Sequence, residues 1–232
     1  MAINKGIFYG VGVGPGDPEL MTVKALRVLK QCPVLACPQT RSGEMLALDI
    51  VKGGMDVSEK TIVPLHFTMS RDEQVQKAAH RKAAEQVAQY LENGQDVAMP
   101  NLGDVSIYST FCYLMEEIRA MGYETRMVAG VPSFCAVAAR LGISLTEMNT
   151  PLHIAPGSAE LSDVLAWPGS KILMKSGRQM PGVLEAIEEK DLLSKSAMVQ
   201  NCGLPNEKVY ETLQDFPKEE AAGYFATVIV KE

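Results

Sequence analysis

The chain has 232 residues, 47% of them hydrophobic and 22% charged, a composition that suits a folded protein with one large or two small domains. Its 22 Lys and Arg against 28 Asp and Glu give a net charge of −6 with neutral histidines, and no basic block stands out, which argues against a nucleic-acid-binding protein. No apolar run approaches the roughly 20 residues needed to span a bilayer and no signal-peptide core is present, so we expect a cytoplasmic protein without a membrane partner.

The first half of the chain alternates between strand and helix patterns. Strand patterns cover residues 5–13, 34–38, 61–67, 96–100 and 123–129, and helix patterns follow them at residues 14–32, 46–54, 72–93, 108–122 and 131–142. In the first helix pattern, Asp17 is a good N-cap, Pro18 suits the first helical position, and Pro33 ends the helix. The alternation predicts an α/β domain with a mostly parallel sheet and helices on both faces.

The pattern changes after Gly142. Residues 143–151 are polar and end in a proline, so we expect a linker there, between a domain of residues 1–143 and a second domain of residues 150–232. The second half shows helix patterns at residues 160–167 and 181–195, a strand at 171–177, a hairpin around residues 203–207 and a closing segment at 223–232. We expect this half to be a second α/β domain with a mixed sheet and fewer helices.

Two glycine-rich turns follow predicted strands. The first, "YGVGVGPGDPEL", fails the dinucleotide fingerprint GxGxxG in both registers, because the sixth position is Pro15 or Asp17, and no GxxxxGK[ST] phosphate loop occurs. A capped tight turn and a ligand contact stay equally open for it. In the second turn, Gly103 lets the backbone pass close to a ligand, and Asp104 can cap the following helix. Both turns belong to the carboxyl edge of the predicted sheet, where ligands of open parallel sheets bind.

Side chains that carry chemistry are few. The three histidines, at positions 66, 80 and 153, have no metal-ligand spacing, so we expect no metal site, and the GxSxG and HExxH motifs of hydrolases are absent. The five cysteines, at positions 32, 37, 112, 135 and 202, form no CxxC pair and stand in mostly apolar sequence, which favours free buried thiols. Cys112 and Cys135 lie on apolar helix patterns and are assigned to the core.

Four motifs in order along the chain carry a family resemblance. The segments "GVGPGDPELMTVKA", "GDVSIYST", "GVPSFCAVAARLG" and "YFATVIV" resemble the tetrapyrrole (corrin/porphyrin) methylases that build cobalamin and sirohaem. The segments "GDVSIYSTF", "HFTMSRD" and "VPSFCAVAARLG" resemble the subgroup that methylates C20 of precorrin-2 or cobalt-factor II. Val105 agrees with that subgroup, whereas Ala129 and Thr68 replace expected prolines and cost backbone rigidity.

The resemblance implies two α/β domains that hold S-adenosylmethionine in the cleft between them, and a homodimer. It assigns the second glycine turn and the segment after the fifth strand to the cofactor, with the adenosyl part enclosed by segments of the C-terminal domain. The implied cofactor contacts are Leu102, Gly103, Asp104, Ile107, Pro132, Ser133, Lys175, Ser176, Asn201, Cys202, Ala226 and Thr227.

Methyl transfer to carbon demands mainly alignment and exclusion of water, because the donor brings its own leaving group. An electron-rich meso carbon needs no protein nucleophile, and a weak base suffices to remove the proton afterwards, so no catalytic residue is assigned. The macrocycle carries many carboxylates and calls for local cations: Arg41 first, then Lys175, Arg178 and Arg71, each of which can instead be a solvated surface charge. Tyr108 and Phe111 can line the ring plane or pack in the core.

Other functions remain open at this point. Within the same fold they are another corrin-ring methylase or the diphthine-forming and ribosomal-RNA-modifying relatives, which the acidic balance and the C20-type motifs disfavour. A nicotinamide dehydrogenase is disfavoured by the failed fingerprint, and a carrier that binds tetrapyrrole without turnover is a third class. The sequence does not distinguish a cobalt-containing from a metal-free substrate.

Overall fold

The computed structural model describes residues 4–68, 70, 72–217, 222–223 and 225–231, and the chain divides between Pro132 and Ser133 into two compact units. We call residues 1–132 the first unit and residues 133–232 the second. The predicted boundary near residue 143 falls further along the chain. Helix α5 (Ser133–Leu141) accounts for the difference, because it packs against strand β10 (Ala226–Val230) of the second unit.

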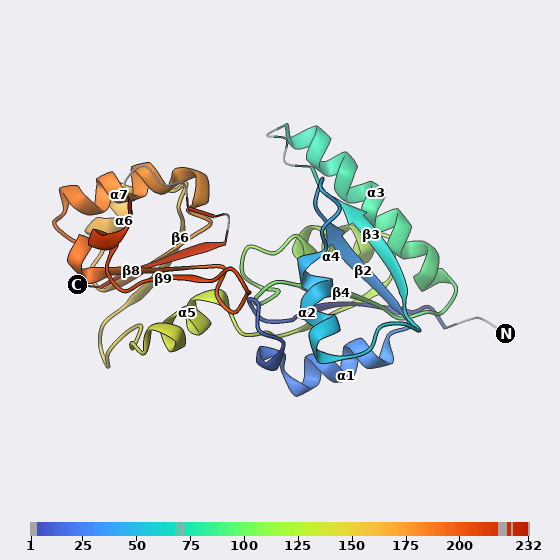
Figure 1. The fold of residues 1–232 in the computed structure, drawn as a ribbon. Helices are drawn as coiled ribbons and strands as arrows, with labels where there is room; N and C mark the ends of the chain where they lie inside the picture. Colours follow the sequence, from blue (N-terminus) through green and yellow to red (C-terminus); the bar gives the residue numbers. More distant parts are fainter. Residues whose placement is uncertain (1–3, 69, 71, 218–221, 224, 232) are drawn as a thin grey trace. The chain divides into compact units, whose positions relative to one another are not determined.

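Strands and helices alternate in the first unit, as predicted. In the described part of this unit they are β1 (Ile7–Gly12), α1 (Val23–Gln31), β2 (Val34–Gln39), α2 (Leu46–Gly54), β3 (Thr61–His66), α3 (Glu73–Glu92), β4 (Val97–Asn101), α4 (Phe111–Ala120) and β5 (Glu124–Val128). The strands form one parallel sheet in the order β3-β2-β4-β1-β5. Helices α1 and α2 cover one face and α3 and α4 the other, which confirms the predicted fold class of this unit (Figure 1).

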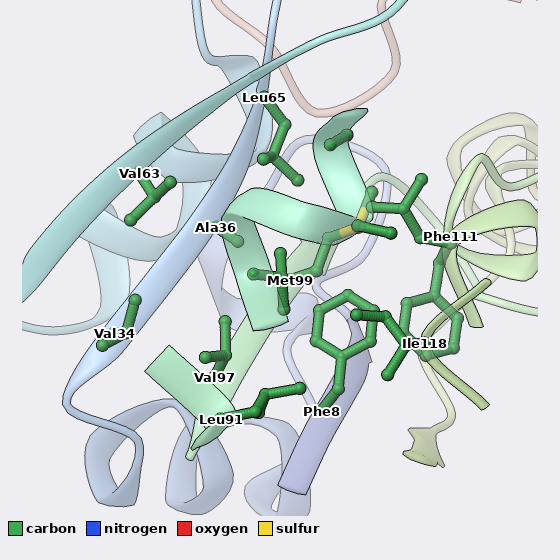
Figure 2. Packing of buried hydrophobic residues seen from close by; sticks show 14 of the residues in the cluster. Phe8, Val34, Ala36, Val63, Leu65, Leu91, Val97, Met99, Phe111 and Ile118 are labelled. Carbon is green, nitrogen blue, oxygen red and sulfur yellow. The ribbon is translucent and has the colours of Figure 1, made fainter. Parts of the chain in front are cut away.

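Along each strand, successive side chains point to opposite faces of the sheet. On the face under α3 and α4, Phe8, Val34, Val97 and Met99 pack together with helix residues, as Figure 2 shows. Phe111 is fully buried there, with its ring 5.1 Å from that of Phe8 between centroids. Its role is therefore core packing, and the alternative that it lines a ligand is wrong.

The first helical segment begins differently from the prediction. Asp17 accepts a hydrogen bond from the Glu19 N–H at 2.8 Å and caps a single 3-10 turn, Pro18–Leu20. The α-helix begins only at Val23, where Thr22 is the N-cap and accepts from the Ala25 N–H at 3.0 Å. Two capping residues five positions apart thus divide the predicted helix into two segments.

The second unit contains a mixed sheet, also as predicted. After α5, its described elements are β6 (Leu152–Pro156), α6 (Leu161–Ala166), β7 (Ser170–Met174), α7 (Met180–Glu189), β8 (Ser196–Gln200), β9 (Lys208–Tyr210) and β10. The strand order is β6-β7-β10-β8-β9, with β6 and β7 parallel and the other pairs antiparallel, so the predicted hairpin of β8 and β9 is confirmed. The predicted helix 181–195 ends at Glu189, and Asp191 then takes a φ of 55° that no α-helix continues through.

Helices α6 and α7 pack on one face of this sheet, against a core that includes Met198 and Val228. Helix α5 lies on the opposite face, where the Ser133 hydroxyl reaches that of Thr227 at 3.4 Å. Among the residues that the structure describes, no helix has the length and apolar character that crossing a bilayer requires.

Candidate functional site

The two glycine turns of the first unit are joined to each other at the edge where β1 and β4 end. Gly103 donates from its N–H to the Gly14 carbonyl at 2.8 Å, and Gly14 donates to the Gly103 carbonyl at 3.3 Å. Gly103 has a φ of 68°, a conformation that glycine adopts at little cost. The turn predicted to cup a cofactor is therefore held by backbone bonds.

A third turn, which follows β5 and contains Gly130, packs against the first two turns. A Cβ atom on Gly12 would lie 2.6 Å from the Gly130 nitrogen and 2.7 Å from the Gly103 oxygen, and a Cβ on Gly130 would also meet the Gly103 oxygen. Real Cβ atoms do not approach backbone so closely. Internal packing of three turns thus explains why Gly12 is a glycine, which favours the tight-turn reading of the first motif.

Asp104 fastens these turns together. Its carboxylate accepts from the Ser106 N–H and the Gly130 N–H, each at 2.8 Å, and from the Ser106 hydroxyl. Burial alone would raise the pKa of Asp104, but these hydrogen bonds outweigh it and leave the pKa below its ordinary value of 3.8. The prediction that Asp104 caps α4 is wrong, because the side chain binds the two loops instead.

The approach to α4 is fixed by a neighbouring polar pair. The Ser109 hydroxyl donates to Asn101 Oδ1 at 2.8 Å and accepts from the Phe111 N–H at 3.1 Å. Asn101 is almost fully buried, and its amide also donates to the Met99 carbonyl at 2.7 Å. Tyr108, which directly precedes Ser109 in the sequence, has a φ of 50° and an exposed side chain. Neither Asn101 nor Ser109 was among the predicted site residues.

In the second unit, half of the predicted cofactor contacts share one end of the sheet. They are Lys175, Ser176, Asn201, Cys202, Ala226 and Thr227. Strands β7 and β8 end there and β10 begins there, since Thr227 pairs with Met174 and Ala226 pairs with Gln200. Helix α5 adds Ser133 through its contact with Thr227. Topology therefore brings together residues that are widely spaced in the sequence.

Left-handed backbone is concentrated at these positions. Among the described residues, the non-glycine residues with positive φ are Tyr108 at 50°, Lys175 at 57°, Asp191 at 55° and Asn201 at 52°. Three of the four are predicted site residues. Such conformations cost about 1–3 kcal/mol each and cluster at functional sites, so this distribution is independent support for the assignment.

The turn after β8 is held by an acidic side chain. Glu207 accepts from the Gly203 N–H at 2.9 Å and from Arg140 Nε at 2.6 Å. Hydrogen bonding from the Gly203 N–H and from Arg140 lowers the pKa of Glu207 in spite of its burial. Burial and the nearby Glu207 raise the pKa of Cys202 to about 11, so this thiol is neutral near pH 7.

One further polar residue lies at the same end of the sheet. Gln200, the last residue of β8, is 4% exposed and accepts from the Gly223 N–H through Oε1 at 3.1 Å. Its Nε2 has no hydrogen-bond partner among the described residues. Gln200 was not among the predicted site residues; the available signal was a polar residue at the end of an otherwise mainly apolar strand.

The basic candidates have different surroundings. Arg41 is exposed in the loop after β2, and the neighbouring Thr40 and Ser42 hydroxyls bond to each other at 2.9 Å instead of serving as additional donors. Arg178 and Lys175 are both exposed after β7, and desolvation by the surrounding chain lowers the pKa of Lys175 below its ordinary value. Arg71 lies outside the described residues.

The described residues contain no cluster of three or more His, Cys, Asp or Glu side chains that could hold a metal ion. The five cysteines are free, and Cys135 is exposed on α5, so its assignment to the core is wrong. A cavity of about 540 Å³ in the second unit is lined by Lys195 and Lys231 where β8 begins and β10 ends, at the opposite end of the sheet from the predicted contacts.

The model of the family described as Tetrapyrrole (Corrin/Porphyrin) Methylases matches residues 8–217. The chain belongs to this family of tetrapyrrole methylases. This methylase is 31% identical to the cobalt-precorrin-2 C(20)-methyltransferase of Salmonella typhimurium, over 98% of its own length and 97% of the relative's. It is 32% identical to the probable cobalt-precorrin-2 C(20)-methyltransferase of Methanocaldococcus jannaschii, over 96% and 95% of the two lengths.

A solved structure confirms the fold. The uroporphyrin-III C-methyl transferase from Thermus thermophilus, complexed with S-adenyl homocysteine, matches this methylase with a TM-score of 0.71 at 18% identity, covering 98% of each chain. The predicted site residues of the methylase form two sets, one in each unit. Leu102, Ile107 and Pro132 of the first set are half-buried near the glycine turns. The contact of each residue with a ligand stays a prediction.

Proposed function

We propose that this methylase uses S-adenosylmethionine to methylate C20 of cobalt-factor II or precorrin-2 in cobalamin biosynthesis. The observation that carries the proposal is the match over almost the whole chain to two relatives named cobalt-precorrin-2 C(20)-methyltransferase. The C20-type motif around Val105 agrees with it. The names of both relatives favour the cobalt-containing substrate.

The residues present suit a nucleoside-bearing methyl donor. Gly12 and Gly130 leave no room for a side chain, because a Cβ atom on either would meet the backbone of the neighbouring turns. In the second unit, the buried Nε2 of Gln200 is a hydrogen-bond donor in need of an acceptor. We assign the binding of the methyl donor to Leu102, Gly103, Asp104, Ile107, Pro132, Ser133, Lys175, Ser176, Asn201, Cys202, Ala226 and Thr227.

S-adenosylmethionine supplies the methyl group, and its sulfur keeps the electron pair of the broken carbon–sulfur bond. The residues of the chain hold the reactants in line and exclude water. The new bond forms at the electron-rich C20, which then loses its proton. No protein nucleophile is needed, in agreement with the shortage of activated side chains in the described residues. The base that accepts the proton is not assigned.

Cations of the methylase bind the carboxylates of the macrocycle. We assign this role to Arg41, Arg71, Lys175 and Arg178, with Tyr108 beside the ring. Desolvation lowers the pKa of the Lys175 amine, and an approaching carboxylate would raise that pKa again. We further propose that the methylase is cytoplasmic and forms a homodimer. Light scattering on the purified protein tests the dimer.

An anaerobic assay tests the function. S-adenosylmethionine is offered with cobalt-factor II and with precorrin-2 separately, and products are followed by mass and by carbon NMR. One added methyl group on C20 is expected, and the faster substrate identifies the pathway. Methyl transfer to another carbon would favour a different corrin methylase. Tight macrocycle binding without transfer would favour the carrier.

A further inference from the structure

We infer that Gln200 donates a hydrogen bond from Nε2 to a ring nitrogen of the adenine of the methyl donor. The inference rests on the proposed use of S-adenosylmethionine and adds a residue that the sequence motifs did not assign. A side-chain amide thus takes part in recognising the nucleoside, in addition to the backbone of the surrounding turns.

The orientation of the amide is fixed by its other half. The Gly223 N–H lies 3.1 Å from Oε1 of Gln200, and a backbone N–H can only donate. A flipped amide would place two donors against each other. Nε2 therefore carries its hydrogens away from Gly223, and what Gln200 offers to a ligand is a donor.

Burial makes that donor significant. Gln200 is 4% exposed, so bulk water does not solvate its amide, and Nε2 has no acceptor among the described residues. Native proteins rarely leave a buried N–H unpaired, and the exceptions call for a specific explanation. An acceptor on a bound ligand supplies one.

The position of Gln200 connects it to the predicted adenosyl contacts. It directly precedes Asn201, whose backbone is left-handed, and it pairs across the sheet with Ala226. The carbonyl of Gly223, the residue that holds Oε1, comes within 2.8 Å of where a Cβ on Gly177 would lie, just after β7. The amide is thus placed where segments of β7, β8 and β10 come together.

The surroundings select the chemistry of the acceptor. Met198, on the same face of β8, is part of the core of this unit, as are the small residues Ala222 and Ala226. Burying a charged acceptor against these apolar side chains is costly, which disfavours the carboxylates of the macrocycle and of the methionine part. A neutral, flat group with an unprotonated ring nitrogen fits, and adenine is the group of the methyl donor with those properties.

Calorimetric titration of the full-length protein with S-adenosylhomocysteine tests the inference. Gln200→Leu should bind about tenfold more weakly, the scale of a donor left unpaired in the complex. Gln200→Glu keeps an oxygen for the Gly223 N–H but loses the donor, so it should bind about tenfold more weakly near pH 8 and recover as its carboxyl is protonated at lower pH. Gln214→Glu, the same change at an exposed residue of the second unit, should bind like wild type.

Deaza analogues provide the decisive measurement. In three analogues of S-adenosylhomocysteine, adenine N1, N3 or N7 is replaced by CH. Each analogue therefore lacks one hydrogen-bond acceptor. One analogue should bind wild type about tenfold more weakly than the parent ligand, yet bind Gln200→Leu as well as the parent does. Because each protein is compared with itself, reduced folding of a variant does not imitate this coupling, and Gln200→Glu near pH 8 serves if the leucine variant does not fold.

The outcomes separate the two proposals. If wild type binds S-adenosylhomocysteine and every analogue loses affinity equally in wild type and variant, the role of Gln200 is overturned and the proposed function stands. If wild type does not bind S-adenosylhomocysteine, the proposed function fails and the inference fails with it.

Discussion

Asp104 and Gly130 are joined by a hydrogen bond of 2.8 Å from the Gly130 N–H to Oδ2, across 26 positions of the sequence. The bond ties the turn after β4 to the turn after β5. Because the other carboxylate oxygen accepts from Ser106, one side chain fixes both the local turn and its distant neighbour. The geometry of the proposed cofactor loops therefore depends on a single buried carboxylate.

Replacing Asp104 by Asn should destabilise the first unit by about 1–3 kcal/mol, because the amide can accept on one side only and turns a donor toward another donor. Urea unfolding measures this. The folded pKa of Asp104 lies below 3.8, so the carboxylate contributes its full stability above that pH and loses it as the pH falls through the folded pKa. The difference in unfolding free energy between wild type and Asp104→Asn should thus be constant from about pH 5 to 8 and shrink below about pH 4.

Asp56 offers a matched control. It also accepts from the N–H and the hydroxyl of the serine two residues later, Ser58, but it is exposed and has no distant partner in the described part of the chain. Asp56→Asn should lower the unfolding free energy much less than Asp104→Asn does. Equal effects of the two substitutions would show that the bond to Gly130 contributes nothing.

The close approach of three turns makes a second prediction. Gly12→Ala would place a methyl group 2.6 Å from the Gly130 nitrogen, and the backbone must shift to admit it. We expect a loss of about 1–3 kcal/mol in unfolding free energy and a weaker binding of S-adenosylhomocysteine, measured by urea unfolding and calorimetry.

Gly182→Ala is the control for this change. Gly182 lies inside α7, and a Cβ there would meet nothing within 4 Å. Alanine is the better helix former, so this variant should be unchanged or more stable by up to about 1 kcal/mol. If both alanine variants behave alike, the steric explanation of Gly12 is wrong.

The elements could be predicted because their signals are local. The helix patterns at 46–54 and 72–93 and the hairpin around 203–207 gave their positions closely, since apolar spacing and capping residues act within a few positions. The order of strands in each sheet did not follow from these signals. In the first unit the sheet order places β4 between β1 and β2, a result of packing between distant segments.

The site was predictable only where motifs mark it. Gly103 and Asp104 stand in a recognisable turn, but the bond from Asp104 to Gly130 and the contact of Ser133 with Thr227 span 26 and 94 positions. Gln200 escaped notice because its meaning depends on what its two amide ends face, and only the folded chain shows that the N–H of Gly223 takes one of them.

The cysteines should differ strongly in reactivity. Burial raises the pKa of Cys32 and Cys37 to about 12 and that of Cys202 to about 11, so these thiols are both covered and protonated. Desolvation raises the pKa of Cys135 as well, but this thiol is exposed on α5, so its accessibility sets it apart. With a coloured disulfide reagent at pH 8, one thiol should react rapidly in the native protein, and the three buried thiols should react only after denaturation.

Cys135→Ser should remove the rapid phase, and Cys32→Ser should leave it unchanged. A rapid phase that persists in the first variant would assign the accessible thiol to another cysteine. The half-buried Cys112, whose pKa burial also raises, would then be the first to examine.

Arg41 provides the prediction that bears most directly on the substrate. It is exposed in the loop after β2, which is held in shape by a hydrogen bond of 2.9 Å from the Thr40 N–H to the Glu44 carbonyl and by the linked hydroxyls of Thr40 and Ser42. Removing the arginine side chain should therefore leave the loop intact. If Arg41 binds a carboxylate of the macrocycle, Arg41→Ala should raise the KM for the tetrapyrrole about two- to fivefold, the scale of a solvent-exposed ion pair, with little change in kcat.

The KM for S-adenosylmethionine should stay at the wild-type value, which separates substrate binding from damage to the cofactor site. Added salt should reduce the difference between wild type and variant, because mobile ions screen an exposed pair. Arg27→Ala is the matched control, since Arg27 is an exposed arginine of the same unit that lies on α1 instead of in this loop. A variant whose tetrapyrrole KM equals that of wild type, or that loses only kcat, would make Arg41 an ordinary surface charge and move the search for the carboxylate partner to Lys175 and Arg178.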